Sequence, residues 1–209
     1  MGTYDFNYTK YQDILVPLLR ELQEQPLGEI TSKWFQALQK RHTRPDGDMF
    51  SKDEIVKAYR GLAGKAGTGL RELEEARIRK IRMKPTRTIS GVTPVTVLTK
   101  PFPCPGKCIF CPNDVRMPKS YLSSEPGAQR AERNYFDPYL QTYNRLQALY
   151  NIGHAVQKAE IIVLGGTWSY YPERYQIWFI KECFRALNEF HGDKQSEPGA
   201  AGREECKRI

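Results

Sequence analysis

The sequence predicts an α/β protein in which a helical N-terminal domain precedes the first two βα units of an incomplete parallel barrel. Over residues 8–84, apolar side chains recur every three or four positions, as they do in amphipathic helices. From residue 85 onward the order becomes strand, loop, helix, strand, loop, helix. We therefore divide the chain into a helical domain (1–84), an α/β domain (85–191) and a polar linker or insertion (192–209). Two βα units cannot close a barrel, so we expect the chain to be incomplete.

Composition and charge narrow the class of protein. The 209 residues are 40% hydrophobic, which suffices for a folded core, and they contain no apolar run long enough to span a membrane. The first residues lack the pattern of a secretory signal, and the five cysteines are an odd number. We therefore expect reduced thiols and a cytoplasmic location. The net charge of +8 favours a polyanionic partner, with RNA or DNA as the usual one.

Three helices are predicted in the helical domain. Pro17 lies within the first stripe and predicts a kink or two short helices. The third helix begins after Ser51, which forms a capping box with Glu54, and should run to about Leu62. The first two apolar stripes comprise Tyr11, Ile14, Leu15, Leu18, Leu19 and Leu22, followed by Ile30, Trp34, Phe35 and Leu38.

A basic segment without acidic residues links the two domains. Such a run is often only a solvated helix face. Here it stands directly before the cysteine loop, and we interpret it as a surface that binds the phosphate backbone of RNA. The candidate RNA-binding residues are Arg77, Arg79, Lys80, Arg82, Lys84 and Arg87.

The α/β domain contains two predicted strands, each followed by a helix. The first strand spans Val92 to Leu98, and Asp137 is positioned to cap the helix after it. The second strand is a short apolar run over residues 159–164, which suits a buried parallel strand. A glycine-rich turn follows it, and the last helix starts near Pro172.

Three cysteines in the loop after the first strand form a candidate metal site. Cys104, Cys108 and Cys111 stand at C-x3-C-x2-C spacing, and no histidine lies near them in the sequence. A structural zinc site needs four ligands, whereas a 4Fe–4S cluster held by three thiolates keeps one iron open for a ligand such as S-adenosylmethionine (SAM). We favour the iron–sulfur cluster over zinc or three unrelated thiols. The turn Gly165-Gly166-Thr167 follows the second strand, so it should face the same site.

The cysteine loop, with Phe110 before the last cysteine, resembles the signature of radical SAM enzymes. The flanking segments 85–92, 137–142 and 153–167, with the basic helical N-terminus, resemble one family, the Elongator catalytic subunit (Elongator protein 3) of bacterial or archaeal type. The resemblance implies a partial TIM-like barrel whose three cysteines hold a 4Fe–4S cluster. It further implies that Phe110 packs near the adenine of SAM and that Gly165, Gly166 and Thr167 meet its methionine end. Lys158 matches a lysine that contacts acetyl-CoA.

The resemblance also implies the reaction, modification of the wobble uridine of tRNA by a carboxymethyluridine synthase of the acyltransferase type. A deoxyadenosyl radical from SAM would take hydrogen from the acetyl group of acetyl-CoA, and the carbon radical would add to the uracil ring. Hydrolysis of the thioester would leave a carboxymethyl group. Family members have a C-terminal acetyltransferase domain, so we expect the 209 residues alone not to complete the reaction.

Two alternatives remain open at this point. One is another radical SAM enzyme, and the other is a zinc-stabilised module that binds nucleic acid. The expected partners are tRNA and acetyl-CoA, without a membrane, and a homodimer is one assembly to test.

Overall fold

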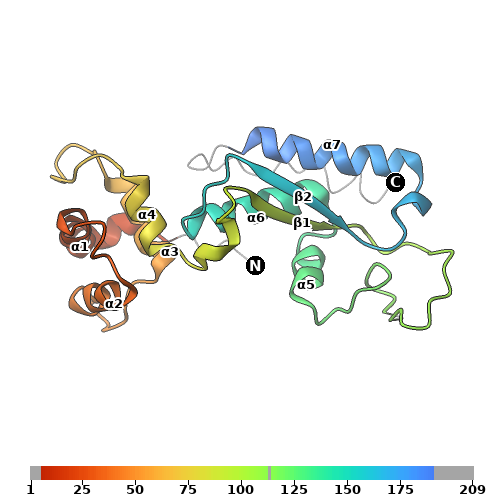
Figure 1. The fold of residues 1–209 in the computed structure, drawn as a ribbon, viewed down its shortest axis with the longest axis horizontal. Coiled ribbons are helices and arrows are strands. Elements are labelled where there is room, and N and C mark those ends of the chain that lie inside the picture. Colours follow the sequence, from red (N-terminus) through yellow and green to blue (C-terminus); the bar gives the residue numbers. More distant parts are fainter. Residues whose placement is uncertain (1–5, 113, 191–209) are drawn as a thin grey trace. The chain divides into compact units, whose positions relative to one another are not determined.

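The computed structural model describes residues 6–112 and 114–190, which fold into two compact units (Figure 1). Unit 1 comprises the residues up to Ser90 together with Leu149–Ala155, and unit 2 comprises Gly91–Ala148 and the residues from Val156 onward. The predicted domain boundary after residue 84 therefore differs from the observed division. The residues after it stay with unit 1 because the buried Thr88 hydroxyl hydrogen-bonds to Nδ1 of His154 at 2.8 Å. The predicted linker over 192–209 lies outside the described residues.

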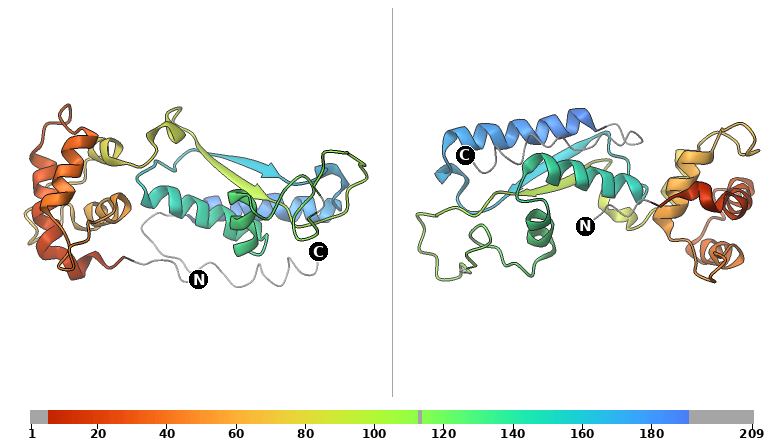
Figure 2. Two further views of the ribbon diagram at one scale, coloured as in Figure 1. Left: turned by 90° about the horizontal axis from the view of Figure 1, so that it is seen from below. Right: turned by 180° about the vertical axis from the view of Figure 1, so that it is seen from behind.

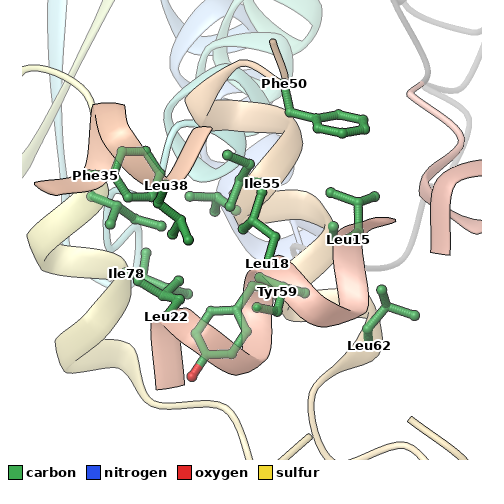
Figure 3. Packing of buried hydrophobic residues seen from close by; sticks show 14 of the residues in the cluster. Leu15, Leu18, Leu22, Phe35, Leu38, Phe50, Ile55, Tyr59, Leu62 and Ile78 are labelled. Atoms are coloured by element: carbon green, nitrogen blue, oxygen red, sulfur yellow. The ribbon is translucent and has the colours of Figure 1, made fainter. Parts of the chain in front are cut away.

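Unit 1 contains the three predicted helices, α1 (Gln12–Glu24), α2 (Ser32–Arg41) and α3 (Lys52–Leu62), and a fourth, α4 (Glu75–Ile81). The short 3₁₀ turns η1 (Tyr8–Tyr11) and η2 (Pro85–Thr88) flank this set. α1 continues through Pro17 as a single helix, so the alternative of two short helices was wrong. The predicted stripes form one core, in which the residues labelled in Figure 3 converge: Leu15, Leu18, Leu22, Phe35, Leu38, Phe50, Ile55, Tyr59, Leu62 and Ile78.

The start of α3 shows how local sequence fixes an element. Ser51 and Glu54 form the predicted capping box, and the Ser51 amide donates to Oε2 of Glu54 at 2.9 Å. This satisfies amide groups that the first turn of a helix otherwise leaves without partners. The helix ends at Leu62, as predicted, and positive φ angles at Gly64 and Gly67 turn the chain away.

Unit 2 is built on two parallel strands, β1 (Thr93–Leu98) and β2 (Ala159–Leu164), which pair residue by residue along their length. Helices α5 (Pro126–Arg133) and α6 (Pro138–Asn151) lie between them in sequence, and the turn η3 (Trp168–Tyr170) and α7 (Glu173–Glu189) follow β2. The last turn of α6 is counted with unit 1. The parallel βα arrangement was predicted correctly, but α5 was not anticipated. The partial TIM-like barrel stays a prediction, since the described residues form two strands.

Helices cover the two faces of this sheet unequally. Val95 and Val97 of β1 pack with Tyr175 and Phe179 of α7, which runs alongside the strands in Figures 1 and 2. The opposite face meets α5 only near the carboxyl end of β1. β2 was expected to be buried, yet Ile162 is 37% exposed. Among the described residues β2 pairs with β1 alone, so one edge and much of one face stay open.

The predicted cap of α6 is confirmed, and the same helix fixes the end of β1. Oδ1 of Asp137 accepts the Leu140 amide at 2.9 Å. One turn further on, the Gln141 side chain donates to the Leu98 carbonyl at 2.8 Å and accepts its amide at 2.9 Å. Both backbone groups of the last residue of β1 are thus satisfied, and the loop that follows leaves from a fixed point. No helix in the described ranges is both long and apolar enough to cross a bilayer.

Candidate metal and cofactor site

The carboxyl ends of β1 and β2 form the base of the candidate site. The ladder extends one step beyond the strands, because the Thr99 amide donates to the Leu164 carbonyl at 2.9 Å. Oγ1 of Thr99 is bonded to the Tyr171 hydroxyl at 2.7 Å. A Cβ at Gly165 would lie 1.9 Å from that Oγ1, which no side chain could tolerate without moving Thr99. Gly165 is therefore required for the close approach of the two loops.

The loop that follows β1 (the β1 loop) and the loop that follows β2 (the β2 loop) border a cavity of about 550 Å³. All three cysteines of the β1 loop and the whole glycine turn of the β2 loop border it, as the sequence predicted. A third segment adds two residues that the sequence analysis did not single out. The lining residues are Cys104, Gly106, Lys107, Cys108, Ile109, Cys111, Lys119, Ser120, Gly165, Gly166 and Thr167.

The thiol of Cys104 forms hydrogen bonds with residues of both loops. Its Sγ lies 3.2 Å from Oγ1 of Thr167 and accepts the Gly106 amide at 3.4 Å. The hydrogen bond from Thr167 is the main influence that lowers the pKa of Cys104, and the Gly106 amide and the Lys119 ammonium group act in the same direction. Cys104 is thus prepared to act as a thiolate ligand.

The other two thiols are close along the chain but are not gathered around a single point. A Cβ at Gly106 would lie 3.5 Å from the sulfur of Cys104 and 3.6 Å from that of Cys108, so these two sulfurs flank the glycine. The Cys111 amide donates to the Cys108 carbonyl at 3.2 Å, which turns the chain back toward the cavity. All three are free thiols.

The described lining of the cavity offers three thiols and no histidine or carboxylate, a donor set that is compatible with an iron–sulfur cluster. Across residues 6–112 and 114–190, no three His, Cys, Asp or Glu side chains are grouped tightly enough to hold one metal ion. A zinc ion draws its ligands to a common centre, whereas each thiolate of an iron–sulfur cluster binds a different iron and can stand further from the next. His42 and His154 are engaged in unit 1 by Glu21 and Thr88, and His191 lies outside the described residues.

Two predicted ligand contacts are not brought to the cavity. Phe110 is 91% exposed and does not border it, and its neighbour Ile109 does. Lys158 precedes β2, where its carbonyl accepts the Thr93 amide at the amino end of the sheet. The strand between Lys158 and Gly165 separates them by roughly 20 Å at ~3.3 Å per residue. Lys158 and the cysteines therefore stand at opposite ends of the sheet.

The predicted RNA-binding residues divide into two groups. Arg77 is buried, and its Nη1 donates to the Leu22 and Gln25 carbonyls at 2.6 Å each, while Nε meets Glu74 at 3.0 Å. The expectation that Arg77 belongs to an exposed basic surface was wrong, because its guanidinium group satisfies the carbonyls at the end of α1. The half-buried Arg82 bonds to Thr88 and Pro85. The remaining four are exposed: Arg79, Lys80, Lys84 and Arg87.

Comparison with known proteins gives relatives but no matching family model. A tRNA uridine(34) acetyltransferase of Methanocaldococcus infernus is 41% identical over 150 residues, covering 66% of this chain and 28% of that protein. One of the same name from Dehalococcoides mccartyi is 48% identical over 105 residues, or 50% of this chain and 23% of that protein. Elongator complex protein 3 of Drosophila melanogaster is 41% identical over 120 residues, which cover 52% of this chain and 22% of that protein.

The aligned part spans about a quarter of the length of these relatives. Within that part, identities of 41–48% exceed what a shared fold alone would require. Over this part the chain is related to tRNA uridine(34) acetyltransferases and to Elongator complex protein 3, and this relationship supports the Elongator protein 3 family, N-terminal part.

Proposed function

We propose that this chain carries the radical SAM part of an enzyme that modifies the wobble uridine of tRNA. The observation that supports it best is the shared cavity, where three free thiols from the β1 loop face the glycine turn of the β2 loop. The relatives are named tRNA uridine(34) acetyltransferases, and these names supply the substrate class. The transferase reaction is proposed for the whole protein, of which this chain represents a part.

The three thiols at the cavity have the central role in this proposal, since Cys104, Cys108 and Cys111 hold a 4Fe–4S cluster. Phe110 lies outside the cavity wall, and on the strength of the resemblance its exposed ring is proposed to pack near the adenine of SAM. The backbone of Gly165 and Gly166, which no Cβ obstructs, approaches the methionine end of SAM closely. When bound, the reduced cluster supplies the electron that cleaves SAM.

Thr167 has a second role in the proposal. Its hydroxyl reaches Sγ of Cys104 at 3.2 Å and so holds that ligand in place. A hydrogen bond to a ligating sulfur also tunes the reduction potential of a cluster.

The tRNA is proposed to bind to the exposed basic residues of unit 1. Arg79 and Lys80 lie in the last turn of α4. Lys84 precedes η2 and Arg87 lies within it, and no acidic residue stands between these four. Four exposed cations in nine residues suit contacts to consecutive phosphates, and such contacts weaken as salt rises. Acetyl-CoA is the proposed co-substrate, and Lys158 is proposed to contact it on the strength of the resemblance. We place the enzyme in the cytoplasm, where tRNA is modified.

The test is reductive cleavage of SAM by the purified protein. The chain is reconstituted anaerobically with iron and sulfide, reduced with dithionite and incubated with SAM, and 5′-deoxyadenosine is measured by mass spectrometry. The proposal expects 5′-deoxyadenosine from the wild type and none from the Cys111→Ala variant. A protein that carries an iron–sulfur cluster but forms no 5′-deoxyadenosine contradicts the radical SAM assignment.

The RNA substrate requires a separate measurement. In a strain lacking the gene, nucleoside mass spectrometry should show the loss of carboxymethyl-derived uridines from the wobble position of tRNA. An unchanged set of wobble uridines would assign the site to another radical SAM reaction.

A further inference from the structure

A third segment borders the cavity beside the cysteines and the glycine turn. Residues 114–123, here called the 114–123 loop, contribute Lys119 and Ser120 to the cavity wall. The lining residues include two cations, Lys107 and Lys119, and no carboxylate. The positive charge of the described wall therefore stands beside the three thiols, and it is complementary both to their thiolate forms and to a ligand that carries a negative group.

The 114–123 loop is held at both ends by Asp114. Its Oδ1 accepts the Arg116 amide at 3.0 Å, and its Oδ2 accepts the Ser123 amide at 3.2 Å. The Arg116 guanidinium donates to Oγ of Ser123 at 2.9 Å. Met117 is buried against Leu98, the last residue of β1. These hydrogen bonds and the packing of Met117 fix the conformation of the 114–123 loop, so its apex has a defined position relative to the strands.

The apex presents Lys119 to the glycine turn. Ser120 has a φ of 79°, a left-handed conformation that non-glycine residues adopt only when their surroundings hold them there. A Cβ at Gly166 would lie 3.4 Å from Cβ of Lys119, so the lysine stem rests against that glycine. Lys119 is half-buried, whereas Lys107 is exposed on the cysteine loop. Lys119 is thus the better-positioned cation.

We propose that Lys119 determines ligand specificity by binding the carboxylate of the amino-acid end of SAM, with Asp114 as its positioning residue. This inference rests on the proposed function. SAM has a positive sulfonium, a positive α-ammonium group and a negative carboxylate, so a lysine stabilises the complex only if it lies nearest to the carboxylate. Gly166, against which Lys119 packs, belongs to the turn assigned to that end. A charge-assisted hydrogen bond of this kind changes affinity about tenfold or more.

The test compares two ligands that differ by the carboxylate alone. Dissociation constants for SAM and for decarboxylated SAM are measured by equilibrium dialysis on the cluster-loaded protein. The wild type should prefer SAM, and Lys119→Gln should reduce that preference about tenfold or more while changing the affinity for decarboxylated SAM less than about threefold. Lys119→Arg keeps a cation and should retain more of the preference, and Asp114→Asn should lose part of it. Lys181→Gln, on the exposed side of α7, is the control and should leave both constants unchanged.

The outcomes separate this inference from the function on which it rests. If Lys119→Gln weakens both ligands equally, the lysine acts through the thiolates or the cluster, and the inference fails. It also fails if the preference for SAM is unchanged. If the cluster-loaded wild type binds neither ligand, the proposed function and the inference fail together. Cluster absorbance and circular dichroism of each variant confirm that folding and loading are intact.

Discussion

Replacing Gly165 with alanine should damage the site through a single contact. The new Cβ would stand 1.9 Å from Oγ1 of the buried Thr99 and 3.1 and 3.2 Å from its Cβ and Cγ2. Overpacking of this kind costs about 1–3 kcal/mol, and displacing the hydroxyl from Tyr171 adds about 1 kcal/mol. We therefore expect Gly165→Ala to lower the free energy of unfolding by about 2–4 kcal/mol. Gly166→Ala is the matched control, because its nearest neighbour lies at 3.4 Å, and it should cost under about 1 kcal/mol.

A double-mutant cycle assigns the cost to Thr99. Thr99→Ala removes the atoms at 1.9 and 3.2 Å, so combining it with Gly165→Ala should recover about 1–2 kcal/mol relative to the sum of the single changes. Urea unfolding can be followed by fluorescence in a Trp34→Phe background, where Trp168 and Trp178 report on unit 2. Additive effects of the two substitutions, or equal costs at Gly165 and its neighbour, would refute the reasoning.

Three further predictions concern single side chains. Arg77→Met should lower the free energy of unfolding by about 3 kcal/mol, because it leaves buried carbonyls without donors. The control Arg79→Met, on the exposed surface, should cost under about 0.5 kcal/mol. Equal costs in urea titrations would show that the buried contacts do not stabilise the helices. Thr167→Val removes a hydrogen-bond donor to the Cys104 thiolate, so the pKa of Cys104 should rise. Alkylation of Cys104 by iodoacetamide at neutral pH should therefore slow in the metal-free protein, as measured by peptide mass spectrometry. An unchanged or faster alkylation rate would contradict this prediction. Burial raises the pKa of Cys183 to about 12, so at pH 9 this thiol should stay protonated and unalkylated in the folded protein and react only in urea. The exposed Cys108 should be alkylated both with and without urea. Alkylation of Cys183 in the folded protein would place it outside the core.

Local signals accounted for the parts of the fold that the sequence predicted well. The capping residues Ser51 and Asp137 act on amides within three residues, so short sequence patterns suffice to locate both helix starts. The meeting of Cys104 with Thr167 followed from one rule, that parallel strands bring their carboxyl ends to the same edge. These predictions needed no knowledge of distant packing.

The residues that were misplaced depend on contacts far apart in the sequence or on weak local patterns. Arg77 appeared to be part of a basic surface because the carbonyls that bind it, Leu22 and Gln25, are more than fifty positions away. α5 was missed because it buries only two alanines, although Pro126 at its first turn was a usable signal. Lys119 reaches the cavity through a loop closed by side-chain hydrogen bonds, which leave no periodic trace.

For Lys158, in contrast, the sequence alone was enough to predict its place at the amino end of the sheet. It precedes β2, so it had to stand at the amino end of the sheet, away from the cysteines. The family resemblance assigned it a ligand without testing that geometry. A contact of Lys158 with acetyl-CoA, as proposed from the resemblance, would therefore lie at a surface other than the cavity.

Whether the three cysteines hold a SAM-binding iron–sulfur cluster is decided by metal and sulfide analysis of the protein purified without oxygen, combined with electron paramagnetic resonance. We expect iron and acid-labile sulfide in equal amounts, a reduced cluster signal that changes when SAM is added, and loss of both in Cys104→Ala. Zinc without sulfide, or a cluster whose signal ignores SAM, would contradict it.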